Sequence, residues 1–330
     1  MADRSSDRSS RPCKQSHANY RDQHVIGDDR QHGFAVTAGI QRILTYKWSV
    51  SVGACPIAIP GTPYHRMLRD ADELERAVMA WADCKRGQMD NRDLLSIVVN
   101  NPDENGQPVS NPRIVGHVPS LLGATYETCK NALIWTLVLL DQHPNVARDL
   151  VDEIEGRLQG ADPTWSSLSD LPLLDGIVKE SMRLLPPIPL QTRTATRNTT
   201  LAGFPIKKSW RVMLSPLLTN RDPDIYPKPD RFLPDRWAAI DPSPFEYSVF
   251  SAGSRLCPGY WFGLAALKTT IAIILTRFRP SIVPNTRVDF RLRVAMSPRR
   301  GIPIVLHPHD KAFSAAPLRG AFRDLVQLPN

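Results

Sequence analysis

One cysteine of this sequence stands where a thiolate could do chemistry. Cys257 lies near the end of the segment 250–259, FSAGSRLCPG, directly before a predicted helix. A helix N-terminus carries partial positive charge and free N–H groups, which together stabilise a thiolate. Arg255 adds a formal positive charge two residues away and suits an anionic group on a ligand. The segment therefore predicts a ligating or reactive sulfur beside a guanidinium group that can bind an anion.

The residues around that cysteine form a longer pattern. Gly253 permits a tight bend, Gly259 permits the close approach of something flat or bulky, and Phe250 could shield the sulfur. A lone cysteine is more often a small buried hydrophobic residue. The pattern F-x-x-G-x-R-x-C-x-G, however, fixes five positions, and ordinary residue frequencies give it a chance occurrence on the order of 10⁻⁴ in such a chain. We therefore interpret Cys257 as a functional residue.

Two charged motifs precede this loop. Glu180 and Arg183 are three residues apart in a predicted helix, so both charges lie on one face and can pair. Such a pair is usually a solvated surface feature. Here a run of prolines follows the helix, and the proline-rich stretch 221–237, an irregular meander, ends in PDRW with Arg236.

In this order the motifs resemble those of the cytochrome P450 family. The resemblance implies that Cys257 is the thiolate ligand of the iron of heme b, on the proximal side. It also implies that Arg255 and Arg193 pair with the two heme propionates through charge-assisted hydrogen bonds. Phe250, Gly253 and Gly259 belong to the same heme-binding loop.

The resemblance also assigns a structural role to three charged residues. In the family, the arginine of the meander completes a buried triad with the helical pair, which here gives Glu180, Arg183 and Arg236. Trp237 stands where the family usually has Phe. A buried charge triad is costly unless all its partners are present, so we expect these residues to hold the proximal scaffold and not to take part in the reaction.

A long apolar helix, predicted over 114–143, supplies candidates for the distal side. Its segment 122–129, LGATYETC, resembles the oxygen-activating helix of the family, with Glu127 and Thr128 as the acid and alcohol that relay protons. Thr125 replaces the usual Gly and narrows the groove for oxygen. The alternative for Glu127 and Thr128 is an ordinary polar stripe of a helix.

Apolar residues near these motifs are candidates for a substrate pocket. The resemblance points to Leu121 and Ala124 on the long helix and to Ile188 and Leu190 after the proline run. Apolar walls suit a lipophilic substrate. Simple core packing is the alternative for each of the four.

The elements that must position these residues are mostly helices. Apolar spacing predicts helices over 62–86, 114–143, 145–158, 173–185 and 260–278, the last being the final helix. Strands are predicted at 191–197, 209–214, 287–294 and 302–306, with Gly203-Phe204-Pro205 as the turn between the first two. This order gives a mainly α fold with a small β component, an α+β arrangement, and the resemblance makes it a cytochrome P450 fold that lacks its N-terminal third.

Composition places the chain among globular proteins. Of 330 residues 42% are hydrophobic and 22% charged, which excludes a wholly disordered chain. The 30 prolines, about twice the usual share, exclude a coiled coil. Five scattered cysteines fit a reducing compartment. We expect residues 1–55 to be divergent and disordered and residues 56–330 to form one domain, with no signal or membrane-spanning segment, although relatives are commonly anchored to the endoplasmic reticulum.

Three functions remain open from the sequence. The first is a monooxygenase that inserts one oxygen atom from O₂ into a lipophilic molecule, with electrons from NADPH through a reductase partner; we expect a fungal secondary-metabolism type acting on a terpenoid or polyketide. The second is an inactive remnant without stable heme. The third is a basic interaction protein, because the net charge is +8 and the stretch 277–323 is basic. That stretch lacks the interleaved aromatic residues of nucleic-acid binders, so we expect no nucleic acid partner.

Overall fold

The computed structural model describes residues 30–46, 49–54, 56–88, 93–292 and 294–329. It divides into two compact units, one up to Ala124 and the other from Thr125 onward. The boundary falls inside the long helix α5 (Asn111–Gln142), which begins in the first unit and ends in the second. The single domain over 56–330 stays a prediction, since a division into compact units does not test it.

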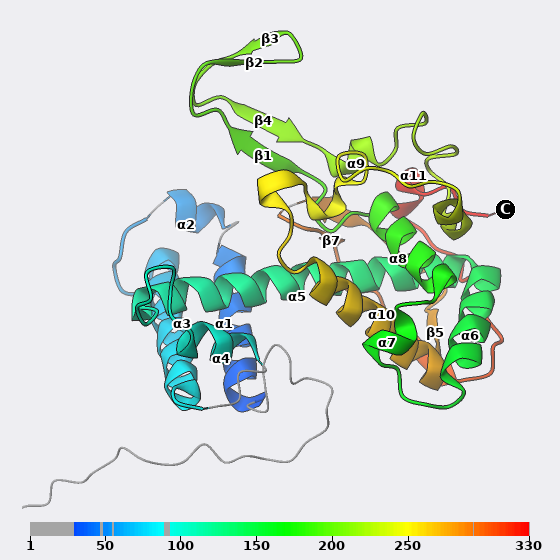
Figure 1. Ribbon diagram of the computed structural model, residues 1–330, viewed down its shortest axis with the longest axis horizontal. Coiled ribbons are helices and arrows are strands. Elements are labelled where there is room, and N and C mark those ends of the chain that lie inside the picture. Colours follow the sequence, from blue (N-terminus) through cyan, green and yellow to red (C-terminus); the bar gives the residue numbers. More distant parts are fainter. Residues whose placement is uncertain (1–29, 47–48, 55, 89–92, 293, 330) are drawn as a thin grey trace, which may run out of the picture. The chain divides into compact units, whose positions relative to one another are not determined.

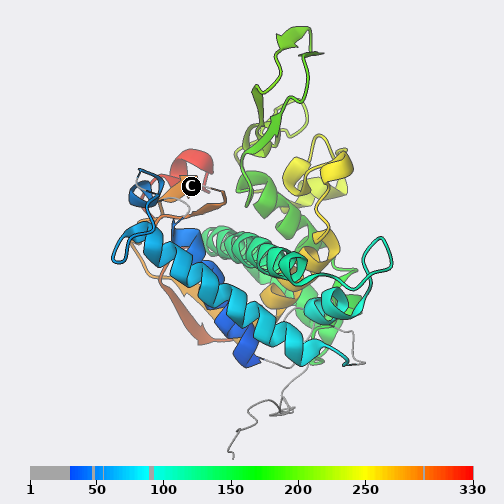
Figure 2. The same ribbon diagram turned by 90° about the vertical axis from the view of Figure 1, so that its left-hand side faces the viewer.

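Helices build the first unit. They are α1 (Arg30–Tyr46), α2 (Val50–Ala54), α3 (Pro63–Lys85), α4 (Leu94–Asn100) and the start of α5. The helix predicted over 62–86 is confirmed as α3, whose first turn is capped by the Thr62 hydroxyl accepting from the His65 N–H at 3.1 Å. α1 lies beside α3 (Figures 1 and 2), and Val36 and Trp81 are fully buried in their shared core.

The helices α1 and α2 lie in the segment that was expected to be disordered. Val36 and Ile40 of α1 are buried against Leu74 and Val78 of α3, so this helix owes its stability to an apolar face with a partner. The expected disorder therefore does not describe residues 30–46 and 49–54. Residues 1–29 lie outside the described part of the chain.

The second unit holds most of the remaining helices. They are the end of α5, α6 (Pro144–Leu158), α7 (Trp165–Leu168), α8 (Pro172–Leu184), α9 (Pro216–Thr219), α10 (Tyr260–Arg277) and α11 (Phe322–Leu325), with 3₁₀ turns η1 (Pro234–Ala238), η2 (Ser248–Phe250) and η3 (Gly253–Arg255). α5, α6, α8 and α10 share one buried core, which includes Trp135, Ile177 and Ile271. The predicted helices are confirmed, except that α10 is not the final one because α11 follows it.

In the described part of the second unit, strands form four antiparallel pairs. They are β1 (Gln191–Thr194) with β4 (Arg211–Leu214), β2 (Thr199–Leu201) with β3 (Phe204–Ile206), β5 (Phe278–Ile282) with β8 (Ile304–Pro308), and β6 (Phe290–Leu292) with β7 (Met296–Pro298). The mainly α fold with a small β component is confirmed. Figure 1 shows the β2–β3 hairpin extending from the end of the β1–β4 pair.

One turn prediction was wrong. Phe204 and Pro205 belong to strand β3, and the turn consists of Ala202 and Gly203, both with positive φ. A two-residue turn with positive φ at both positions matches the twist of a hairpin, and Gly203 adopts that conformation without steric cost.

Among the described residues, no helix has both the length and the apolar character needed to cross a membrane.

Candidate active site

Cys257 lies in a tight loop two residues before the N-cap of α10, Gly259. Its N–H donates to the Phe250 carbonyl at 2.9 Å, which closes the loop on itself. The sulfur is free of any disulfide and the residue is only partly buried. The loop thus presents a thiol, near a helix N-terminus, to whatever approaches it.

Two glycines and a serine shape this loop. Gly253 has φ of +61°, a conformation that glycine adopts without strain. Ser251 also has positive φ, 62°. A Cβ on Gly259 would lie 3.8 Å from the Cys257 sulfur, so this glycine borders the thiol directly. The Phe250 ring packs edge-on against Tyr260, with ring centroids 4.6 Å apart.

Two arginines border the loop. Arg193 of β1 donates to the Ser251 hydroxyl at 3.3 Å and to the Gln191 side-chain oxygen at 3.4 Å, both long bonds. Arg255 is exposed, and its guanidinium has no partner among the residues that the structure describes. The structure therefore brings Arg193 to the loop of Cys257, and both cations keep donors for an added anion.

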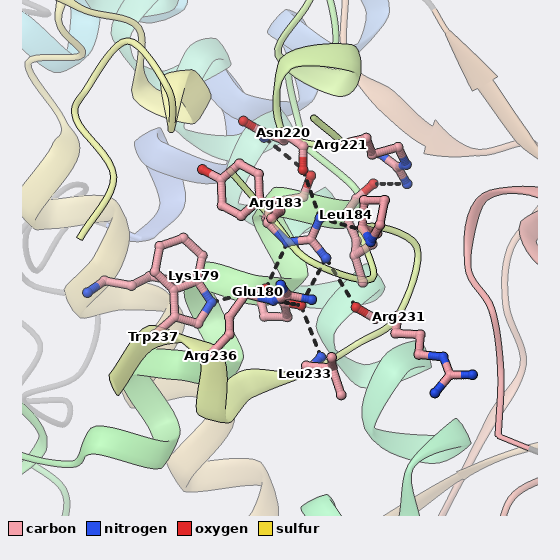
Figure 3. Close-up of polar contacts among 12 residues, drawn as sticks. Lys179, Glu180, Arg183, Leu184, Asn220, Arg221, Arg231, Leu233, Arg236 and Trp237 are labelled. Atoms are coloured by element: carbon pink, nitrogen blue, oxygen red, sulfur yellow. Dashed lines mark hydrogen bonds and ion pairs between the residues drawn. The ribbon is translucent and has the colours of Figure 1, made fainter. Parts of the chain in front are cut away.

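Glu180 of α8 is the centre of a saturated cluster (Figure 3). Its carboxylate is fully buried and accepts two bonds from Arg183, from Nε at 2.8 Å and from Nη2 at 2.9 Å. Arg236 of η1 donates its Nε at 3.0 Å, and the Leu233 N–H donates at 3.0 Å. The structure thus brings Glu180, Arg183 and Arg236 together around one carboxylate.

Trp237 completes the set of donors to Glu180. Its indole Nε1 donates to Glu180 Oε2 at 3.1 Å, and its ring lies edge-on against Tyr247 at 4.9 Å. Sequence reasoning noted this residue only as a departure from the family pattern. A Trp at this position could have been recognised as an N–H donor, because phenylalanine has no group for that bond.

Backbone carbonyls take the remaining protons of Arg183. Its Nη1 donates to the Asn220 and Pro229 carbonyls at 2.8 and 2.7 Å, and its Nη2 donates to the Arg231 carbonyl at 3.1 Å. Buried charges are stable only when such partners are complete. The meander is therefore folded around the guanidinium of Arg183.

The cluster also changes the pKa of its neighbours. Burial is the main reason that the pKa of Tyr226, whose ring lies under the Arg183 guanidinium, rises to about 12. Burial likewise raises the pKa of Tyr247 well above its ordinary value. Burial lowers the pKa of Arg221, which donates to the Leu184 carbonyl at 2.7 Å. Both tyrosines therefore stay uncharged near neutral pH, which suits a structural region.

Glu127 and Thr128 lie on α5, in the second unit. The Glu127 carboxylate is about one-third exposed and pairs with Lys130 at 2.5 Å, while Lys130 also lies over the Tyr126 ring. The Thr128 hydroxyl donates to the Thr125 carbonyl over a long 3.5 Å. The acid is therefore held by a cation on its own helix, an interaction that sequence reasoning did not predict.

Cys129 is a neighbour of the Cys257 loop that sequence reasoning missed. Its sulfur lies 3.9 Å from the place that a Cβ on Gly263 of α10 would occupy. Burial is the main cause that raises the pKa of its thiol, and Cys257 contributes in the same direction. The middle of α5, which carries Thr128 and Cys129, thus lies near the start of α10, which Cys257 directly precedes.

The predicted substrate residues are divided between the units. Leu121 and Ala124 belong to the first unit, whereas Ile188 and Leu190 belong to the second. Ile188 is partly buried, and Leu190 is exposed. A surface cavity of about 590 Å³ lies in the second unit, and none of the four lines it. It is lined by Arg193, Met213, Leu214, Leu218, Phe245 and Ser251, among others.

These residues fit a heme group. A free thiol can ligate iron, and the guanidinium groups of Arg193 and Arg255 suit two carboxylates. Exposed apolar side chains flank the thiol, Leu256 before it and Trp261 after it, and they suit the face and edge of a large apolar ring. The donor set therefore matches an anionic, flat, iron-containing ligand.

Comparison with known proteins gives consistent matches. Residues 54–304 match the family model described as Cytochrome P450. Beta-amyrin 6-beta-monooxygenase of Solanum lycopersicum is 27% identical over 261 residues, which are 77% of this chain and 54% of that protein. Cyclooctatin synthase of Streptomyces melanosporofaciens is 34% identical over 220 residues, 65% of this chain and 48% of that protein.

A solved structure agrees with these relatives. The structure described as retinoic acid bound cyanobacterial CYP120A1 superposes with a TM-score of 0.76 at 25% identity, covering 87% of this chain and 66% of that one. This chain spans about half the length of the curated relatives it matches. The relatives named here are from a plant and from bacteria, and they give no support to the expected fungal type.

Proposed function

Because this chain belongs to the cytochrome P450 family, we propose that it is a heme-thiolate monooxygenase that inserts one atom of O₂ into a lipophilic small molecule. The observation that carries the proposal is the Cys257 loop, where a free, partly buried thiol lies next to two arginines with donors to spare. Heme b, ligated by that thiolate, would supply the activation of O₂. Residues of the chain would hold the cofactor and deliver protons.

Arg193 and Arg255 bind and orient the cofactor in this proposal. Each guanidinium would donate charge-assisted hydrogen bonds to one propionate, and the bonds that Arg193 makes to the Thr192 carbonyl, Ser251 and Gln191 leave other N–H donors for that contact. Gly259 leaves room beside the sulfur, because a side chain there would contact it. The Glu180 cluster fixes the meander to α8.

Glu127 and Thr128 move protons in this proposal. A carboxylate that is partly exposed can exchange protons with solvent, and the neighbouring hydroxyl can pass them inward. Lys130 must then release or share Glu127 during turnover, since the two form an ion pair at rest. Two protons and two electrons convert the second oxygen atom to water, and we propose that NADPH supplies the electrons through a reductase.

We propose a terpenoid as the substrate. Similar proteins are described as a beta-amyrin monooxygenase and a pentalenene oxygenase, and both of those compounds are polycyclic terpenoids. Leu121, Ala124, Ile188 and Leu190 are the proposed apolar contacts. A secondary-metabolite pathway follows from this substrate class.

The absorption spectrum of the reduced chain with carbon monoxide tests the proposed heme-thiolate ligation. The chain is produced with heme supplied, reduced and exposed to carbon monoxide, and the expected result is the red-shifted Soret band typical of a thiolate ligand. Cys257→Ala should abolish the band, and Cys84→Ala, which removes another free cysteine, should keep it. Absence of the band from the unaltered chain would overturn the proposal and favour a remnant without heme.

A further inference from the structure

Cys129 is a second free thiol beside the candidate heme ligand, and the proposed function does not use it. It lies in the middle of α5, and neither it nor Cys257 takes part in a disulfide. Both residues are only partly buried, which leaves them within reach of a small oxidant. The third cysteine in the described part of the chain, Cys84, belongs to the first unit. Cys129 and Cys257 are therefore the described thiols that share a unit.

The two sulfurs lie against the same turn of α10. A Cβ on Gly259 would be 3.8 Å from the Cys257 sulfur. A Cβ on Gly263 would be 3.9 Å from the Cys129 sulfur. The Gly263 N–H donates to the Gly259 carbonyl at 2.7 Å, so one helical turn separates the two glycines, and Cβ positions at this spacing are about 5–6 Å apart. Burial raises the pKa of the Cys129 thiol, and Cys257 adds to this rise, as a nearby group of like charge does.

A disulfide between the two cysteines requires the loop to move, and the helices can stay in place. Its geometry needs sulfurs about 2 Å apart and Cα atoms roughly 4.4–6.8 Å apart. Cys257 lies before the N-cap of α10, and its N–H bond to the Phe250 carbonyl is local to the loop. Gly253 of the same loop has φ of +61°, and glycine changes its backbone conformation at little steric cost. The loop can therefore bring Cys257 to Cys129 while α5 and α10 remain packed.

We propose that Cys129 is an oxidation partner of Cys257, and that hydrogen peroxide joins the two in a disulfide when the chain holds no heme. One thiol takes an oxygen atom from the peroxide and becomes a sulfenic acid, which releases one water. The other thiol attacks that sulfur, the S–S bond forms, and a second water leaves. The two thiols together lose two electrons and two protons, and one peroxide is reduced to two waters.

The disulfide and the heme exclude each other, and this consequence rests on the proposed function. A sulfur in an S–S bond has no thiolate to offer, so the linked chain cannot ligate iron through Cys257. A thiol reductant restores the linked pair, whereas a sulfenic acid without a partner is oxidised further to acids that the reductant does not restore. Cys129 therefore protects the ligand from permanent oxidation before the cofactor binds.

The first experiment detects the bond in the full chain produced without heme. The reduced chain is treated with hydrogen peroxide, free thiols are blocked with N-ethylmaleimide, and the monomer is digested with trypsin in the absence of reductant. Trypsin places Cys129 in the peptide 114–130, Cys257 in 256–268 and Cys84 in 77–85. We expect mass spectrometry to find 114–130 linked to 256–268, and dithiothreitol to separate them. Absence of this link, or an equal amount of 256–268 linked to 77–85, overturns the proposal.

The second experiment compares Cys129→Ser with Cys84→Ser, the matched control. Each chain is treated with peroxide and desalted, and its affinity for hemin is measured at the Soret band before and after treatment with dithiothreitol. The unaltered chain and Cys84→Ser should lose affinity severalfold and regain it with the reductant, whereas Cys129→Ser should not regain it. Equal recovery in Cys129→Ser overturns the protective role. If the untreated chain shows no thiolate-ligated heme, the proposed function fails instead, and the linked peptides still decide whether the disulfide forms.

Discussion

The Glu180 cluster and the Cys257 loop lie in the same unit but differ in whether their polar groups have hydrogen-bond partners. Glu180 is fully buried, and five N–H bonds from four residues saturate its carboxylate. Arg255, by contrast, is exposed without a partner among the described residues, and Cys257 is free and partly accessible. A saturated buried cluster contributes to stability, whereas donors left open are available to a ligand. Variants in the two regions should therefore have separate effects.

The largest effect on stability is expected at the centre of the cluster. Glu180→Gln keeps the shape but removes the charge that two buried guanidinium groups require, so unfolding free energy should fall by about 3–5 kcal/mol. Urea unfolding followed by circular dichroism measures it. The matched control is Glu246→Gln, since Glu246 accepts the Ser243 N–H within a local turn at the surface, and its midpoint should hardly move. A loss below about 1 kcal/mol for Glu180→Gln would show that the cluster is not the stabilising centre.

The opposite pattern is expected in the loop. Arg255→Gln should weaken heme binding by about tenfold, the equivalent of one charge-assisted hydrogen bond, and leave the urea midpoint of the heme-free chain unchanged. Titration with hemin, followed at the Soret band, measures the affinity. Arg300→Gln removes the same charge at another exposed position and serves as the control. Equal affinities for the two variants would contradict a specific role for Arg255.

Trp237 lies at the edge of the Glu180 cluster and contributes one of its hydrogen bonds. Trp237→Phe removes the 3.1 Å bond to Glu180 but keeps an aromatic ring, so the unfolding free energy should fall by about 1–2 kcal/mol. Trp210→Phe, at a half-exposed indole directly before β4, should change stability little. Differential scanning calorimetry compares the melting temperatures of the two variants. Equal melting temperatures would show that the Trp237 bond does not stabilise the cluster.

The helices of the second unit could be predicted because their signals are local. Apolar spacing placed α5, α6 and α8, and also α3 of the first unit, to within a few residues. β5 could not be predicted in this way: it contains Pro280 and exists because it pairs with β8, some twenty-six residues later. α1 was missed for a similar reason, since its apolar face acquires meaning only against α3.

The candidate site also combines features that local sequence predicts with features that only tertiary packing creates. Some site residues belong to motifs with fixed spacing, so the sequence alone was enough to predict them. These residues are Cys257, Arg255, Glu180 and Arg236. The Lys130 ion pair with Glu127 and the closeness of Cys129 to α10 carry no motif. These contacts depend on side-chain rotamers and on which helices pack together. Packing across the whole unit determines both the rotamers and the helix contacts.

The smallest effect is expected where an ion pair is exposed, at Asp310. The guanidinium of Arg279, with help from the Ala312 N–H, lowers the pKa of this carboxyl from 3.8 to about 2. A lowered folded-state pKa stabilises the protein above the ordinary pKa, and this contribution disappears as pH falls through the range between the two values. The urea midpoint of the unaltered chain should therefore exceed that of Asp310→Asn slightly at neutral pH, and the difference should vanish as pH approaches about 2. Salt should shrink the same difference, because exposed pairs are screened, whereas it should hardly change the effect of Glu180→Gln. A difference that grew on acidification would contradict the pairing of Asp310 with Arg279.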